Sequence, residues 1–131
     1  MLGDVIELSI VVRDLESAVK RFEDLFDLKV YRRGESKEFG FKNAILPLGK
    51  GHIELMQPTD PASAVARFLE TRGEGVYLVG FDAEDIPSKV RKLQDRGARV
   101  THPSDDAPVA WVHPKDAHGV FVELRRPEKY S

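Results

Sequence analysis

The chain has 131 residues, of which 41% are hydrophobic and 32% charged, and its 20 basic residues nearly balance 22 acidic ones. This composition is typical of one globular domain and provides no basic surface for nucleic acid or anionic lipid. The absence of cysteine excludes disulfides, thiolate nucleophiles and thiolate metal sites. The first residues lack the basic segment of a signal peptide and no apolar run reaches about 18 residues, so we expect a cytoplasmic protein.

The first half of the chain has the pattern of one strand, one helix and three further strands. Apolar and polar residues alternate over 5–12, which places Glu7 and Ser9 on the same face of a strand. Asp14 precedes apolar residues at helical spacing, and this predicts a capped helix over about 15–27. The remaining strands of this half are expected near 28–33, 38–48 and 51–57.

The second half repeats this order. A strand over 76–83 leads to a helix that begins at Asp85 and Ile86 and ends near Gly97. The last strands are expected at 98–101, 108–113 and 119–125.

Local sequence matches support a duplication with a period of about 70 residues. Residues 13–19 match 84–90, and residues 53–58 match 122–127. Two copies are too few for a solenoid, so the pattern predicts an α+β domain of two tandem βαβββ modules that share one sheet. In a single domain over 1–131, the expected parts are module 1 at about 4–58, a linker helix at about 59–75 and module 2 at about 76–126.

Glutamates occupy equivalent places in the two modules. Glu54 and Glu123 each lie between apolar residues of a last strand, so strand alternation turns both away from the apolar face. On the first strand of each module the equivalent residues are Glu7 and Leu78. Three converging carboxylates could hold a hard divalent cation or exchange protons. The alternative is that they are solvated at a rim or paired with arginine.

Two segments resemble the vicinal oxygen chelate (glyoxalase/bleomycin resistance/dioxygenase) superfamily, and within it the methylmalonyl-CoA epimerase family. They are 51–80, with Ile-Glu-Leu-Met-Gln-Pro at 53–58, and 110–124, with His-Pro-Lys-Asp at 113–116. The likeness covers nearly the whole chain. It implies a curved mixed sheet around a central cleft with the helices outside. It also implies a homodimer that binds a small molecule, and neither nucleic acid nor membrane.

The resemblance further implies a metal site. In that family four residues on four strands hold a divalent metal, and Glu7, Glu54 and Glu123 match three of these positions. Glu7 replaces a ligand histidine with another possible ligand, whereas Leu78 replaces the second histidine with a residue that has no donor atom. A magnesium, manganese, cobalt, calcium or zinc ion would therefore have three carboxylates and lack its fourth ligand.

Catalytic residues can be carried over in the same way. Glu38 matches a glutamate that resembles the family's proton-abstracting base, and Glu123 or a neighbour would then be the second acid. The alternative is that Glu38 is an exposed glutamate of a charged strand, because Glu35 and Lys37 lie beside it. His52, two residues before Glu54, could supply a ligand from another place, or it could simply be a hydrogen-bonded histidine beside a turn. The residues expected to line the pocket are Ser9, His52, Leu78, Gly80 and Trp111.

Two functions from different classes follow. The first is an epimerase-, isomerase- or lyase-like enzyme that transfers a proton α to a carbonyl or an acyl-CoA thioester. The second is a metal-free protein of the bleomycin-resistance type that binds or sequesters a small molecule. The segment likeness favours the enzyme, and Leu78 favours the binding protein. Ring-cleaving dioxygenase activity is disfavoured because its iron requires two histidines and one carboxylate.

Overall fold

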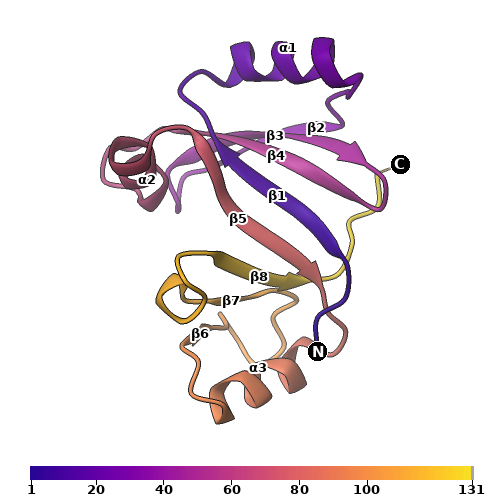
Figure 1. Ribbon diagram of the computed structural model, residues 1–131, viewed down its shortest axis with the longest axis vertical. Helices are drawn as coiled ribbons and strands as arrows, with labels where there is room; N and C mark the ends of the chain where they lie inside the picture. Colours follow the sequence, from indigo (N-terminus) through magenta and orange to yellow (C-terminus); the bar gives the residue numbers. More distant parts are fainter. Residues whose placement is uncertain (131) are drawn as a thin grey trace. The chain divides into compact units, whose positions relative to one another are not determined.

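The computed structural model describes residues 1–130, which form eight strands, three α-helices and one 3-10 helix (Figure 1). The elements are β1 (Val5–Val11), α1 (Leu15–Phe26), β2 (Arg32–Ser36), β3 (Phe41–Leu48), β4 (Gly51–Pro58), α2 (Ala64–Arg72), β5 (Gly75–Asp82), α3 (Ile86–Asp95), β6 (Val100–Thr101), β7 (Ala110–Val112), η1 (Pro114–Asp116) and β8 (Phe121–Arg125). The hydrogen-bonded order of the strands is β2-β3-β4-β1-β5-β8-β7-β6.

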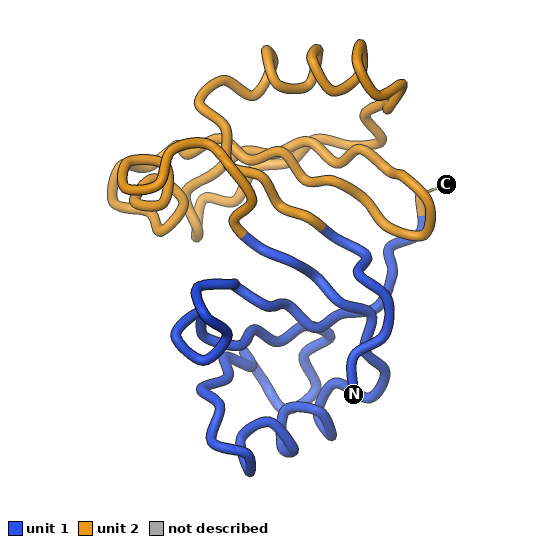
Figure 2. The backbone as a smooth tube through the Cα atoms, viewed as in Figure 1, with its two compact units in different colours: residues 1–7, 78–129 blue, residues 8–77, 130–131 orange. Residues whose placement is uncertain are grey.

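The chain divides into two compact units (Figure 2). Unit 1 contains residues 1–7 and 78–129, and unit 2 contains residues 8–77 and 130–131. The first residues belong to unit 1 because Gly3 N–H donates to the Asp82 carbonyl at 2.7 Å and Asp82 N–H donates to the Asp4 carbonyl at 2.8 Å. The residue ranges of the two units therefore differ from those of the modules expected at 4–58 and 76–126. The boundaries of the modules stay predictions.

In unit 2, α1 packs on the face of β3 and β4 (Figure 1). Asp14 begins this helix, since its Oδ1 accepts from Ser17 N–H at 3.0 Å. Leu15 and Val19, four residues apart on one helix face, are both buried. The buried residues of this core are Val12, Leu15, Val19, Ala44, Leu46 and Leu55. Each buried leucine contributes roughly 1.5–3 kcal/mol to stability.

A second apolar cluster in unit 2 involves α2. Ser63 caps this helix by accepting from Ala66 N–H at 3.0 Å. Val65 of α2 packs with Val11 of β1 and Met56 of β4. Val11 and Val12 thus belong to different clusters, which confirms the alternation predicted for the first strand.

Unit 1 has its own core, built on α3. Asp85 caps this helix through Ser88 N–H, and Ile86 and Val90 are its buried residues. The cluster is completed by residues of β7, β8 and the segment before α3, namely Ala83, Ala110, Val112 and Leu124. β8 pairs in parallel with β5 and antiparallel with β7, and β7 pairs antiparallel with β6.

The predicted helices are confirmed, but parts of several predicted strands are wrong. The strands expected at 98–101 and 108–113 are shorter, as β6 and β7. Residues 28–31 form no strand, and β2 instead runs from Arg32 to Ser36. Leu28 and Val30 pack against the α1 core from an irregular segment, so their apolar character reflects burial rather than strand pairing. Residues 37–40 form a turn, which uses the positive φ of 69° at Gly40.

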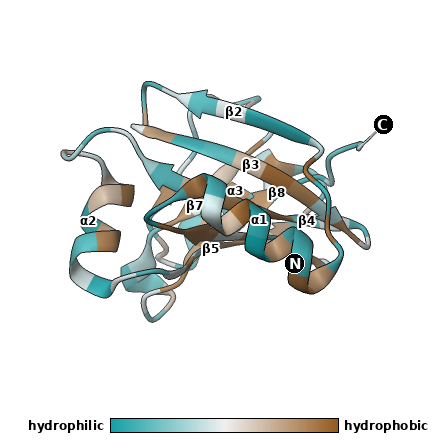
Figure 3. Ribbon diagram, turned by 90° about the horizontal axis from the view of Figure 1, so that it is seen from above, coloured by the Kyte–Doolittle hydropathy of each residue, from teal (hydrophilic) through white to brown (hydrophobic). Residues whose placement is uncertain are grey.

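Hydropathy distinguishes the edge strand from the strands beside it. β2, with the sequence Arg-Arg-Gly-Glu-Ser, is mostly hydrophilic and appears teal in Figure 3. Charged residues on an edge strand discourage pairing with another chain. Among residues 1–130, none of the helices combines the length and apolar character that crossing a bilayer requires.

Candidate functional site

Unit 1 contains a buried cluster of two carboxylates and one guanidinium, which we call the acid–arginine cluster: Glu7, Glu123 and Arg125. Glu7 is 5% exposed and Glu123 is 7% exposed. Arg125 Nη1 lies 3.2 Å from Glu7 Oε2 and 3.5 Å from Glu123 Oε2. One cation is therefore shared by two acids, one from β1 and one from β8.

The strand pattern of β8 explains why two of these residues face the same way. Glu123 and Arg125 are two positions apart and share one face of the strand. Val122 and Leu124 occupy the opposite face and pack in the core of α3. The prediction that the neighbours of Glu123 face the core is confirmed.

Gly80 provides the space in which the acids approach each other. It lies opposite Glu123 in the parallel pairing of β5 and β8. A Cβ atom at Gly80 would lie 2.8 Å from Glu7 Cβ, 3.1 Å from Glu7 Oε1 and 3.4 Å from Glu123 Oε2. Any larger residue would displace Glu7 from the cluster.

Trp111 fixes the second oxygen of Glu123. It lies opposite Glu123 in the antiparallel pairing of β7 and β8. Its indole Nε1–H donates to Glu123 Oε1 at 2.9 Å. Glu123 thus has a donor at each oxygen, Trp111 at one and Arg125 at the other.

Burial changes the acidity of this site. Desolvation raises the pKa of Glu123 to about 8, and the hydrogen bond and negative charge of Glu7 act in the same direction. Arg125 and Trp111 oppose this increase in the pKa but do not cancel it. Glu123 therefore retains a proton near neutral pH and can act as a general acid.

Glu54, the equivalent of Glu123, has very different surroundings in unit 2. Ser9 Oγ–H donates to Glu54 Oε1 at 2.6 Å, and Asn43 Nδ2–H donates to Glu54 Oε2 at 2.6 Å. Ser9 is 1% exposed and comes from β1, whereas Asn43 comes from β3. Both carboxylate oxygens therefore already accept hydrogen bonds from neutral groups.

His52 is a buried, hydrogen-bonded histidine beside the turn between β3 and β4. Its Nδ1 lies 2.6 Å from Tyr130 Oη, and the two rings meet edge to face with centroids 5.7 Å apart. The sequence left two possibilities for His52, a metal ligand or a hydrogen-bonded histidine beside a turn, and this geometry agrees with the second.

Glu38 lies on the exposed turn that joins β2 to β3. The turn is held by Gly40, whose N–H donates to the Ser36 carbonyl at 2.9 Å and whose carbonyl accepts from Thr59 N–H at 2.8 Å. The strand expected to begin at Glu38 begins at Phe41 instead. A catalytic role for Glu38 stays a prediction.

The four positions that the resemblance implies as ligands do not suit a divalent metal. Leu78 is 8% exposed, lies opposite Phe121 on β8 and offers no donor atom. Glu7 and Glu123 already share a positively charged partner. Within residues 1–130 there is no group of three or more histidine, cysteine, aspartate or glutamate side chains that could hold a metal ion. We therefore derive no chemistry through a metal.

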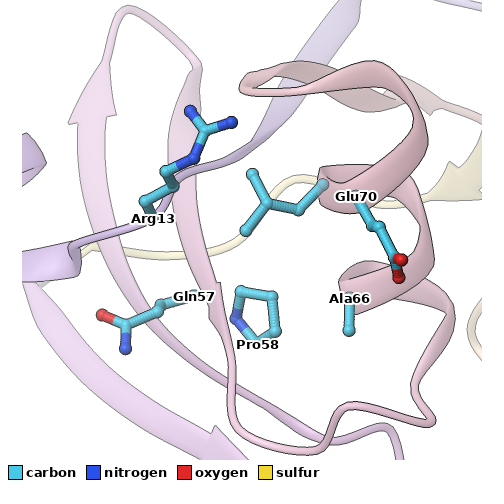
Figure 4. A pocket seen from close by; sticks show the side chains of 6 residues that line it. Arg13, Gln57, Pro58, Ala66 and Glu70 are labelled. Atoms are coloured by element: carbon cyan, nitrogen blue, oxygen red, sulfur yellow. The ribbon is translucent and has the colours of Figure 1, made fainter.

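An open pocket of about 400 Å³ lies in unit 2. Figure 4 shows its labelled side chains, which come from the segment between β1 and α1, from β4 and from α2. The lining residues are Arg13, Gln57, Pro58, Ala66, Leu69 and Glu70. It contains none of the residues predicted for the site.

Two residues of these polar clusters were missed by sequence reasoning. Arg125 has a usable signal, because a residue two positions after Glu123 on a strand must share its face. Asn43 has none, since its contact with Glu54 depends on the register of β3 against β4.

Known proteins match this chain over most of its length. The profile of the Glyoxalase/Bleomycin resistance protein/Dioxygenase superfamily matches residues 7–114. The ethylmalonyl-CoA/methylmalonyl-CoA epimerase of Cereibacter sphaeroides is 29% identical over 133 residues, covering 96% of this chain and 99% of that protein.

Solved structures give the same result. The methylmalonyl-CoA epimerase of Mycobacterium tuberculosis has a TM-score of 0.87 and 27% identity, covering 98% of this chain and 90% of that one. A methylmalonyl-CoA epimerase in complex with methylmalonyl-CoA and NH4+ has a TM-score of 0.89 and 26% identity, covering 100% and 99% of the two chains. The predicted α+β fold with a mixed sheet is confirmed, as is the resemblance to the epimerases. The chain belongs to the glyoxalase/bleomycin resistance protein/dioxygenase superfamily.

Proposed function

We propose that this chain is an epimerase-like isomerase that moves a proton at the carbon α to the carbonyl of an acyl-CoA thioester. The observation that carries the proposal is the full-length likeness to proteins named as ethylmalonyl-CoA and methylmalonyl-CoA epimerases. A 2-alkylmalonyl thioester is therefore the substrate class to test first.

The chemistry requires one group that removes a proton and another that returns it to the opposite face. We assign the removal to Glu38: its carboxylate takes the α-proton, and the electron pair of the broken C–H bond moves to the thioester oxygen as an enolate. We assign the return to Glu123, which is suited to it because its raised pKa, about 8, keeps it protonated at neutral pH. Each turnover would leave the total number of protons unchanged.

Proton exchange with solvent tests this directly. The protein is incubated with methylmalonyl-CoA in D₂O, and deuterium at the α-carbon is followed by NMR or mass spectrometry. We expect exchange with the unaltered protein and a loss of at least about 100-fold in Glu38→Gln and in Glu123→Gln. Glu35→Gln is the matched control, because Glu35 is an exposed glutamate of β2 outside the proposed site.

A second candidate is a small-molecule binding protein without turnover. The specific observation in its favour is Leu78, a buried aliphatic side chain at a position where the resemblance implies a ligand. Calorimetric titration with methylmalonyl-CoA separates the two. Binding without any solvent exchange would overturn the isomerase and support this candidate.

The assembly and the cellular location expected from the sequence stay predictions. Light scattering on the purified protein would test the homodimer, and fractionation of the producing cells would test the cytoplasmic location. Neither result affects the assignment of Glu123 as an acid.

A further inference from the structure

We propose that Arg125 is the resident cation of this site. Its guanidinium pairs with Glu7 and Glu123, keeps a divalent metal ion out of that position and donates from Nη2 to an oxygen of the bound acyl group. The last part rests on the proposed function, whereas the first two concern only the charges of unit 1.

The first step of the argument is that Arg125 already uses the oxygens a metal would need. Nη1 lies 3.2 Å from Glu7 Oε2 and 3.5 Å from Glu123 Oε2. A divalent ion bound by the same two oxygens would be placed beside a permanent positive charge, because a guanidinium does not lose its proton in proteins. Metal and guanidinium therefore compete for one place.

The second step is that part of the guanidinium remains available. Its Nε donates to the Arg126 carbonyl at 3.2 Å, and its Nη1 contacts the two acids. Within the part of the chain that the structure describes, no hydrogen bond of Nη2 is found, the negative charge of Glu128 also acts on the guanidinium, and the Arg125 side chain is 24% exposed. Because the group is planar, Nη2 lies next to Nη1 and can donate to a carboxylate or enolate oxygen close to Glu123.

The third step comes from the duplication. In the match of 53–58 to 122–127, the counterpart of Arg125 is Met56, which is 5% exposed and packs with Val11 and Val65. The duplicated pattern therefore does not demand an arginine here. The cation is found in the module whose first strand carries Leu78, a residue without a donor atom, at a position where the resemblance implies a ligand.

The charge part is tested with Mn²⁺ alone, by electron paramagnetic resonance on chelator-treated protein. Leu78→His restores a ligand, and we compare it with the double variants Leu78→His/Arg125→Met and Leu78→His/Arg126→Met. We expect Mn²⁺ to bind at least about tenfold more tightly to the Arg125 double variant than to the other two. Arg126 is the matched control because it is exposed and pairs with Asp82 and Glu84 instead.

Two results of this titration would overturn the inference. One is stoichiometric Mn²⁺ in the unaltered protein. The other is equal Mn²⁺ affinity in the two double variants, since Arg125 would then have no influence on the metal. If Arg125→Met fails to fold by circular dichroism, Arg125→Gln, carrying Leu78→His, replaces it with the same expected outcome, because glutamine removes the charge and keeps a hydrogen-bond donor beside the two acids.

The ligand part is tested by deuterium exchange into methylmalonyl-CoA. We expect exchange to survive EDTA, to fall at least about 100-fold in Arg125→Met, to recover in part in Arg125→Lys and to stay unchanged in Arg126→Met. Lysine restores the charge but has no Nη2, so partial instead of full recovery separates donation to the substrate from the charge pairing with the two acids.

The possible failures are distinguishable. Exchange that EDTA abolishes would overturn the role of Arg125 and leave the isomerase standing. No exchange in the unaltered protein would overturn the isomerase, together with the ligand part, and the Mn²⁺ titration would still decide the charge part.

Discussion

Glu54 and Glu123 occupy the same position in two copies of one module, yet their surroundings differ completely. Glu54 accepts hydrogen bonds from two neutral donors, Ser9 and Asn43. Glu123 lies against another acid, Glu7, and shares a guanidinium with it. The same strand position thus holds a carboxylate saturated by neutral donors in unit 2 and a carboxyl that retains its proton in unit 1.

The difference arises from the residues that occupy neighbouring strand positions and not from the backbone. Ser9 of β1 corresponds to Gly80 of β5, so the hydroxyl that binds Glu54 is replaced in unit 1 by space for Glu7. Met56 corresponds to Arg125, so an apolar neighbour is replaced by a cation. The strand pattern is therefore the same at the two positions, and the surroundings of Glu123 raise its pKa.

The largest effect expected from this contrast is on the pH dependence of stability. The pKa of Glu123 rises from 4.5 to about 8 on folding, so the folded state binds an extra proton between these values. The corresponding stability is fully present below pH 4.5 and is lost as the pH rises through 8. We expect the free energy of unfolding to fall by about 5 kcal/mol over this range.

Urea unfolding at a series of pH values measures this slope. Glu123→Gln should remove most of it, and Glu54→Gln, the equivalent change in unit 2, should leave it in place. A slope that survives Glu123→Gln would show that another group carries the proton.

The next effect in size concerns the space at Gly80. Gly80→Ala places a Cβ atom 2.8 Å from Glu7 Cβ. We expect a loss of about 2 kcal/mol in the free energy of unfolding, because overpacking displaces either the strand or the acid. Gly75→Ala, on the same strand with no atom within 4 Å of the new Cβ, is the control and should leave stability nearly unchanged. Equal melting temperatures for the two variants would contradict this account of Gly80.

A smaller effect is expected in unit 2. Ser9→Ala removes one of the two hydrogen bonds to Glu54 and should cost about 1 kcal/mol, measured by urea unfolding. Ser9→Thr keeps the hydroxyl and should lose less if the buried site accommodates the methyl group. A loss as large as that in Gly80→Ala would mean that the two clusters do not differ as described.

The smallest effect is expected for an exposed acid–arginine pair. Asp116 accepts from Arg99 at 2.8 Å, and the hydrogen bonds of Arg99 lower the pKa of Asp116 to about 2. Its contribution is present above the ordinary value of 3.8 and is lost as the pH falls through 2. Solvent screens this pair, so Asp116→Asn should change the melting temperature at pH 7 less than Ser9→Ala does. If Asp116→Asn changed the melting temperature more than Ser9→Ala does, solvent exposure would not explain the difference between this pair and the buried hydrogen bond of Ser9.

Much of the fold follows from local signals in the sequence. Asp14 and Asp85 each precede an apolar helical stripe, and both are helix caps in the structure. Alternation along the strands correctly separated Glu54 and Glu123 from their apolar neighbours. These features depend only on residues close together in the chain, which is why a sequence can reveal them.

The parts that sequence reasoning missed depend on distant partners. Leu28 and Val30 look like strand residues but are buried without strand pairing, because the α1 core covers them. Glu38 lies in a turn because Gly40, two residues later, takes a positive φ. The sequence allowed that the acids pair with an arginine, but it did not indicate which one. The pairing of Arg125 with Glu7 joins residues far apart in the chain, and no local pattern encodes it.

The separation of Glu7 and Arg125 along the chain, 118 residues, has a consequence for biosynthesis. The ribosome produces Glu7 well before the strand that carries Arg125. Contacts between such remote segments form late and slow the folding of small domains. A growing chain thus has no complete acid–arginine cluster until the segment with Arg125 has emerged, so products truncated before that segment would lack the cluster.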